Sequence, residues 1–178
     1  MKNQGMKQEL YSQMGILLEY PLNDYRGMLQ ALISQIEPMS SNASNYLKDF
    51  YSKMKRMDLT MWQEYYVQSF DMMPRCSLYL SVHLFGEESF KRAELMAGLK
   101  AVYEKHKEFQ LTELPDHAAV VLRENILFDD EEWADLCSMC ILPALEIMIS
   151  KLEKDNNAYA FILKAVQSLL VEMEPAHV

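Results

Sequence analysis

Few residues in this sequence of 178 have the types and spacing of a chemical site. Cys137 and Cys140 form a CxxC pair, the spacing found in zinc sites and in redox-active cysteine pairs. A structural zinc normally has four ligands, and the chain contains no second CxxC and no HxxxH pair. Both cysteines fall on the apolar stripe of an expected helix, where reduced cysteine packs as a small hydrophobic side chain. We interpret them as core residues and keep a redox or metal role as the alternative.

Two histidines stand near carboxylates. His83 and Glu87 are four residues apart, but Gly86 is expected to end their helix, so a polar contact at a bend is favoured over metal binding. Asp71 with His83 or His117 has the composition of an acid–base pair, yet no serine stands in the glycine-rich elbow of a nucleophile. No GxGxxG or GxxxxGK[ST] phosphate motif occurs. We therefore expect no enzyme, no cofactor and no metal.

Composition narrows the classes of partner. The net charge is −9, which argues against nucleic acid and favours a basic peptide or a basic segment of a protein. The acidity is concentrated between Glu113 and Asp135, where eight carboxylates accompany Arg123 alone. Fourteen methionines suit either irregular cores or adaptable binding surfaces.

The sequence also predicts the compartment. No apolar run approaches the ~18 residues of a membrane-spanning helix, and the N-terminus MKNQGMKQEL lacks the apolar segment of a secretory signal. Three cysteines are too few for a disulfide framework. We expect a cytoplasmic protein that does not insert directly into the membrane.

The elements that must position these residues are helical, because apolar residues recur at helical spacing and no strand-like alternation stands out. At 178 residues one domain is expected, an all-α bundle of about eight or nine helices. In the first part of the chain we expect a helix that ends at Tyr20 before Pro21, a helix over Tyr25–Ile36, a helix capped within Ser40–Asn42, and a helix that begins at Met61 after a Thr60/Gln63 capping box. Two further helices are expected from Leu78 to Leu84 and from Glu87 to Glu108. The last three are a helix from His117 to Leu127 capped by Asp116, a helix after Asp129 that is kinked at Pro143, and a helix after Asn157.

An aromatic segment stands at the centre of the chain. Trp62, Tyr65, Tyr66 and Phe70 fall on one face of their helix. Such a face is ordinarily core, but tyrosine and tryptophan carry polar groups that also suit a peptide-binding groove. The residues alone leave the two interpretations equal.

A resemblance to a known family covers Trp62 to Leu122. The motif YVxxFD at Tyr66–Asp71 is followed at a distance by LPDH at Leu114–His117. The matching positions also include Ser77–Leu80, His83, Gly86–Glu87, Arg92, Glu113 and Val121–Leu122. In order and spacing, this stretch resembles the NarJ branch of the NarJ/TorD/DmsD redox-enzyme maturation chaperones.

The resemblance implies a dedicated cytoplasmic chaperone. Such proteins bind the basic N-terminal region of the apo catalytic subunit of a molybdenum enzyme of the nitrate-reductase or dimethyl-sulfoxide-reductase type. They hold it for molybdenum cofactor insertion, before membrane attachment or export, and cofactor delivery proteins are further candidate partners. The alternative is a helical scaffold or regulatory subunit that binds another protein without a role in cofactor insertion.

The resemblance also assigns positions. It divides the single domain 1–178 into an N-terminal half of about 1–109, a hinge loop of about 110–117 and C-terminal helices over 118–174. Such a loop is compatible with a monomer or a domain-swapped dimer. The residues expected to bind or support the client peptide are Trp62, Tyr65, Tyr66, Phe70, Asp71, Tyr79, His83, Leu114, Pro115, Asp116, His117 and Leu122.

Overall fold

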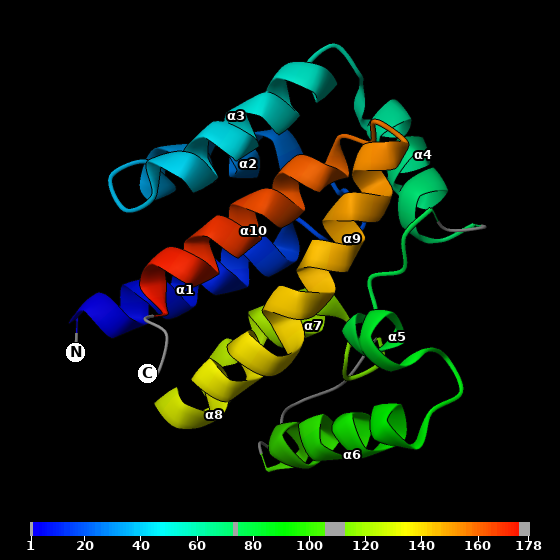
Figure 1. Cartoon of the computed structure of the whole chain (residues 1–178). Coiled ribbons are helices and arrows are strands. Elements are labelled where there is room, and N and C mark those ends of the chain that lie inside the picture. The colour runs from blue at the N-terminus through cyan, green and yellow to red at the C-terminus, as the bar shows by residue number, and fades with distance from the viewer. Residues whose placement is uncertain (1, 73–74, 106–112, 175–178) are drawn as a thin grey trace.

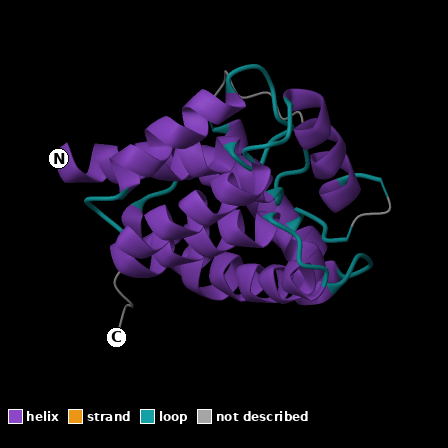
Figure 2. Ribbon diagram, turned by 90° about the horizontal axis from the view of Figure 1, so that it is seen from above, coloured by secondary structure: helices purple, strands orange, loops and turns teal. Residues whose placement is uncertain are grey.

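A computed structural model describes residues 2–72, 75–105 and 113–174 of the chain. Within these ranges the protein is built from helices and loops and contains no strand, as Figure 2 shows. Figure 1 labels the α-helices, which are α1 (Lys2–Ile16), α2 (Tyr25–Ile36), α3 (Ser41–Met54), α4 (Leu59–Phe70), α5 (Leu80–Phe85), α6 (Phe90–Glu104), α7 (Ala118–Arg123), α8 (Asp130–Leu136), α9 (Leu142–Lys154) and α10 (Tyr159–Met173). Two further elements are the 3₁₀ turn η1 (Asn125–Leu127) and the π-helical turn η2 (Cys137–Ile141).

The predicted fold class is confirmed. Helices α8, η2 and α9 form one continuous rod from Asp130 to Lys154, so the ten α-helices of the described residues make nine rods. Pro143 is the second residue of α9 and lies inside this rod, where it has no N–H to donate to the preceding turn, and the π-helical turn η2 lies immediately before α9. The kink expected at Pro143 stays a prediction. The described residues thus form a single all-α domain.

The core is centred on α10, which packs against α3 on one side and α9 on the other, while α1 packs on α7 (Figure 1). Tyr159, Ile162 and Leu169 of α10 are buried, as its apolar stripe predicts. Helix α10 therefore lies between the N-terminal helix α3 and the C-terminal helix α9. The division into two halves with a hinge stays a prediction, and residues 110–112 of that hinge lie outside the described residues.

Several helix ends differ from the sequence predictions. The first helix ends at Ile16 and not at Tyr20. Helix α4 begins at Leu59, because Asp58 rather than Thr60 is its N-cap and accepts a hydrogen bond from the Met61 N–H at 2.9 Å. By contrast, Ser40 caps α3 as predicted, through a 3.0 Å hydrogen bond from the Ala43 N–H.

The helices on either side of the hinge are also shorter than predicted. Helix α5 begins at Leu80 rather than Leu78, α6 begins at Phe90 rather than Glu87, and α7 ends at Arg123 and continues only as η1. The predicted end of α6 at Glu108 lies outside the described residues. Asp116 does not cap α7, because His117 occupies the N-cap position without a side-chain hydrogen bond and the Asp116 side chain lies elsewhere.

Contrary to the expectation from the sequence, one helix of the described residues is long and apolar enough to cross a membrane: the rod Asp130–Lys154, with a mean hydropathy of 1.5 over its most apolar window. Half of that window is buried inside the protein, and the core helix of a soluble protein passes the same test. Ala144, Leu145 and Met148 are fully buried in the core. This packing explains the apolar composition of the rod.

Candidate peptide-binding site

The two motifs of the sequence meet in space at a short pairing of extended chain. Tyr79 and His117 form an isolated antiparallel bridge. On either side of it the Leu80 N–H donates to the Asp116 carbonyl at 3.0 Å, and the Ala118 N–H donates to the Leu78 carbonyl at 2.8 Å. This pairing, which we call the junction, delays the start of α5 and fixes the LPDH segment against the segment that follows α4.

A buried charged group holds the junction to α5 and α6. The Asp116 side chain is fully buried, and its Oδ2 accepts a short hydrogen bond from the Ser81 hydroxyl of α5. Arg92 of α6 donates from Nε to the same hydroxyl at 3.1 Å, and its Nε lies 4.0 Å from the Asp116 carboxylate. Because an unpaired buried charge is costly, this triad fixes the position of α6 relative to the hinge segment.

Tyr79 and His117 present the polar side of the junction. The Tyr79 hydroxyl donates to Glu113 Oε2 at 2.9 Å, and its ring meets the His117 ring edge-on at 5.3 Å. Burial lowers the pKa of His117, against the opposing effect of nearby carboxylates led by Glu113 and Asp116. Partial burial and Glu113 together raise the pKa of Tyr79 to about 12, so its hydroxyl stays a donor at neutral pH.

Asp71 adds a second exposed carboxylate near Glu113. Partial desolvation and then the Glu113 charge raise the pKa of Asp71, which shows that the two carboxylates repel each other. Leu114 is 41 % exposed beside them. We call the exposed residues Asp71, Glu113 and Leu114, together with the half-buried Tyr79, the junction surface; it is acidic and carries one aliphatic side chain.

The aromatic face of α4 points into the core. Trp62, Tyr66 and Phe70 are each at least nine-tenths buried, and Tyr65 is half-buried. Three of the rings surround Tyr159 of α10, with ring centroids separated by 4.8 to 5.9 Å. The α4 aromatics therefore support the site from beneath, and their contact with a client stays a prediction.

The polar atoms of Trp62 and Tyr66 are satisfied inside the protein. The Trp62 indole donates to the Met54 carbonyl at 2.7 Å, and the Tyr66 hydroxyl donates to the Leu18 carbonyl at 3.1 Å. An outer edge of Trp62 also lines a small pocket of about 320 Å³ beside Arg26 and Leu59. Buried aromatic residues with internal partners are typical of a structural role.

His83 is held by its neighbours rather than by Glu87. Its Nε2 donates to the Ser77 carbonyl at 2.8 Å, and its Nδ1 accepts from the Lys151 ammonium at 3.2 Å. Burial and the Lys151 charge lower its pKa, which favours this neutral form. His83 therefore links α5 to α9 at a half-buried position, which differs from the contact with Glu87 at the bend that the sequence predicted.

The three cysteines are free and buried. Burial raises the pKa of Cys76 and Cys140 to about 12 and raises that of Cys137 as well, so none is a thiolate at neutral pH. No group of three or more His, Cys, Asp or Glu side chains among the described residues is arranged to hold a metal ion. The burial of Cys137 and Cys140 agrees with their interpretation as core.

The predicted residues thus form two layers. Pro115, Asp116 and Leu122 join the α4 aromatics below the surface, and Asp71, Tyr79 and Leu114 reach solvent. Sequence reasoning had not assigned Ser81, Arg92 and Lys151 to the site. Arg92 is one of the positions that match the family pattern. The only signal in the sequence for its role was that a basic residue could pair with the carboxylate of the LPDH segment.

The described residues therefore form an all-helical domain with an acidic surface over the junction. A model of the family described as nitrate reductase delta subunit matches residues 23–132, which is more than half of the chain, and the chain belongs to this family. Its members act as chaperones in molybdoenzyme assembly. A search of curated proteins gave no match.

Proposed function

We propose that this protein is a maturation chaperone that binds the N-terminal region of the apo catalytic subunit of a nitrate-reductase-type molybdenum enzyme. The observation that carries the proposal is the family match over residues 23–132. The matched segment begins just before α2 and ends in the first turn of α8. It includes the whole junction and all twelve predicted site residues.

The charge of the protein supports a basic client segment. The net charge of −9 and the exposed carboxylates of Asp71 and Glu113 favour encounter with a positively charged peptide. The exposed Leu114 offers an apolar contact beside them. Opposite charges mainly raise the association rate and select against acidic partners, and apolar contacts then slow dissociation.

The mechanism requires no catalysis. By binding the apo form of the client more tightly than the finished enzyme, the chaperone stabilises a state that still accepts the molybdenum cofactor. Once the cofactor is in place, the client no longer offers the same segment, and the chaperone is released. We place this cycle in the cytoplasm, before the client is attached to a membrane or exported.

Calorimetric titration tests the proposal. The probe is a synthetic peptide of the N-terminal residues of the catalytic subunit from the same organism, with the full-length apo subunit as a second ligand. We expect binding that weakens as salt rises from about 0.01 M to about 1 M, because the Debye length falls from about 30 Å to about 3 Å. The double variant Asp71→Asn with Glu113→Gln should show weaker binding and a smaller salt dependence.

The matched control neutralises two exposed carboxylates that are not part of the junction surface, Asp49 on α3 and Glu146 on α9. Asp49→Asn with Glu146→Gln changes the net charge equally and should leave binding almost unchanged. Absence of binding to both the peptide and the full-length subunit would contradict the proposal. If this protein stays bound to the cofactor-loaded enzyme, the result would instead indicate that it is a permanent regulatory subunit.

A further inference from the structure

A chain of hydrogen bonds runs from α9 to the junction surface. The Lys151 ammonium of α9 donates to Nδ1 of His83 at 3.2 Å, and Nε2 of His83 donates to the Ser77 carbonyl at 2.8 Å. The Ser77 hydroxyl accepts from the Tyr79 N–H at 3.1 Å, and the Tyr79 hydroxyl donates to Glu113 at 2.9 Å. We call these contacts the relay. They connect α9, which lies outside the segment of the family match, to two residues of the junction surface.

The segment that leads into α5 depends on α9 for its position. Residues 75–79 form no helix that could hold them in place by itself. The thiol of the buried Cys76 donates weakly to the Met148 carbonyl of α9 at 3.9 Å. Met148 and Lys151 are three residues apart in the helix and therefore share one face of it. That face of α9 holds the segment at two points, directly at Cys76 and through His83.

The relay requires one protonation state of His83. A carbonyl oxygen only accepts and an ammonium group only donates, so the ring carries its proton on Nε2 and a lone pair on Nδ1. A second proton on Nδ1 would replace this hydrogen bond by two like charges facing each other. Lys151 is exposed, so its side chain then turns away into water and the relay breaks between α9 and α5.

The surroundings of His83 leave Lys151 as the charge that faces the ring. The Cys76 sulfur lies 4.0 Å from Nε2, but its thiol is uncharged at neutral pH. Helices α6 and η2 also pack on α5. From α6, the Arg92 guanidinium is bonded to the Ser81 hydroxyl, and η2 contributes buried thiols. Burial lowers the pKa of His83 and the Lys151 charge lowers it further, so the ring is neutral at neutral pH.

We infer that Lys151 and His83 position the junction surface for the client. Neutral His83 lets α9 hold Ser77 and Tyr79 in place, and protonation of His83 disconnects them from α9 and weakens client binding. This inference rests on the proposed function and adds a pH-dependent regulation to it. Both side chains act through Tyr79, which makes them positioning residues.

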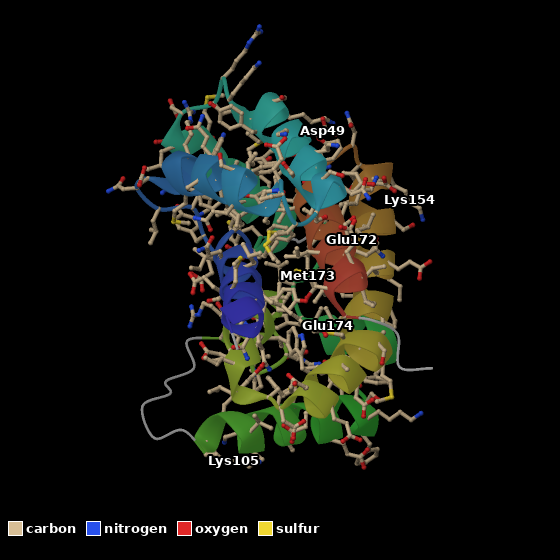
Figure 3. The ribbon with its side chains drawn as sticks, turned by 90° about the vertical axis from the view of Figure 1, so that its left-hand side faces the viewer. Asp49, Lys105, Lys154, Glu172, Met173 and Glu174 are labelled. Atoms are coloured by element: carbon tan, nitrogen blue, oxygen red, sulfur yellow. The ribbon has the colours of Figure 1, made fainter. Side chains whose placement is uncertain are left out.

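Four variants separate the relay from general effects of charge. Lys151→Met removes the ammonium but keeps an apolar stem, whereas Lys151→Arg keeps both the charge and a donor. Lys154→Met is the matched control, because Lys154 is an exposed lysine one turn further along the same helix (Figure 3). His83→Gln keeps one N–H donor and one acceptor, as in neutral imidazole, but does not titrate.

Affinity for the client peptide and for the full-length apo subunit is measured by calorimetry at about pH 7.5. We expect Lys151→Met to weaken binding about fivefold, because Tyr79 loses its connection to α9. Lys151→Arg, Lys154→Met and His83→Gln should each stay within about twofold of the unmodified protein. Thermal unfolding checks that all four variants are folded.

The same titrations from about pH 7.5 to about pH 5.5 give a readout that a purely structural lysine would not change. The folded pKa of His83 is lowered, so the neutral ring and the relay are lost as pH falls below about 6.5. The affinity of the unmodified protein should therefore approach that of Lys151→Met, and His83→Gln should lose less affinity than the unmodified protein. His117 and the junction carboxylates titrate in every variant, so differences between proteins report His83.

Nuclear magnetic resonance of the histidine rings tests the contact in the free protein. Without the Lys151 charge the pKa of His83 should rise in Lys151→Met, and it should stay unchanged in Lys154→Met. An unchanged pKa in Lys151→Met, or an affinity gap between Lys151→Met and the unmodified protein that is equal at every pH, would overturn the inference and leave the proposed function standing. If the unmodified protein binds neither the peptide nor the subunit, the proposed function fails, and the regulation inferred from it fails as well.

Discussion

Arg92 and Asp116 face each other across the interior of the protein, with the guanidinium Nε 4.0 Å from the carboxylate Oδ2 and the Ser81 hydroxyl bonded to both. The Asp116 side chain is completely buried, and the Arg92 side chain is 18 % exposed. The pair ties α6 to the LPDH segment, although 24 residues separate them in the sequence. The LPDH motif therefore has a structural role through Asp116, and its contact with a client stays a prediction.

Asp116→Ala should destabilise the protein by about 3 kcal/mol, because it leaves the Arg92 charge without its buried partner. Urea unfolding measures the change. Asp135→Ala, at an exposed carboxylate on α8, should change stability by less than about 0.5 kcal/mol. Equal stability of Asp116→Ala and the unmodified protein would show that the pair does not hold α6 in place.

Gly86 and Gly98 should respond to alanine in opposite directions. Gly86 ends α5 with φ of 80° and ψ of 171°, a conformation that costs other residues of order 1–3 kcal/mol. Gly98 is helical with open space around it, so alanine should stabilise by up to about 1 kcal/mol. Thermal unfolding should show Gly86→Ala melting below the unmodified protein and Gly98→Ala above it. A rise for both variants would contradict the assigned backbone at Gly86.

Stability should fall as the pH is lowered through the range in which histidine titrates. The pKa values of His83 and His117 are lowered in the folded protein by burial. The unfolded chain therefore takes up protons first, and the stability contributed by the neutral side chains is lost as pH falls below about 6.5, the unfolded pKa.

The variant His117→Gln isolates this effect, because glutamine does not titrate. Melting temperatures of both proteins, measured from pH 7.5 down to pH 5.5, should fall less steeply for the variant. Identical pH dependence of the two proteins would exclude His117 as a source of the acid sensitivity.

The cysteines should be inert in the folded state. Cys76, Cys137 and Cys140 are buried, and their raised pKa values keep them as thiols. Thiol-reactive dye at neutral pH should label none of them quickly, and all three should react once the protein is unfolded in guanidinium. Rapid labelling of Cys137 or Cys140 in the native protein would revive the redox hypothesis.

Local signals predicted much of the fold. The stripe Tyr25–Ile36 became α2 with its expected buried face, and Ser40 caps α3, because both depend on spacing within a single helix. The start of α4 was predicted wrongly because Thr60 and Gln63 have the spacing of a capping box, while Asp58 forms the actual cap two residues earlier. Two candidate caps so close together cannot be ranked by spacing alone.

Long-range contacts account for the other differences. Tyr79 directly precedes α5 but remains extended because its segment pairs with residues 116–118. The Asp116 side chain turns inward to Ser81 instead of capping α7. These contacts join segments about 35 residues apart, which periodicity does not report. The family resemblance predicted that the two segments contribute to the same site, although it did not distinguish their buried residues from their exposed ones.

Helix α6 shows a different limit. Leu95, Met96, Leu99, Val102 and Tyr103 form an apolar stripe on α6, and the sequence predicted all five to face the core. Only Leu99 and Tyr103 are buried, and the other three are half-covered. An apolar stripe identifies a helix face that is buried away from water. The same stripe arises whether other helices of this chain or a partner protein bury that face.

The most direct test of the central claim compares two states of the client. The protein is titrated with the full-length catalytic subunit, once in the apo form and once loaded with the molybdenum cofactor. A maturation chaperone should bind the apo form at least about tenfold more tightly, a difference of about 1.4 kcal/mol in binding free energy. Equal affinity for the two forms, or no binding to the apo form, would contradict the account.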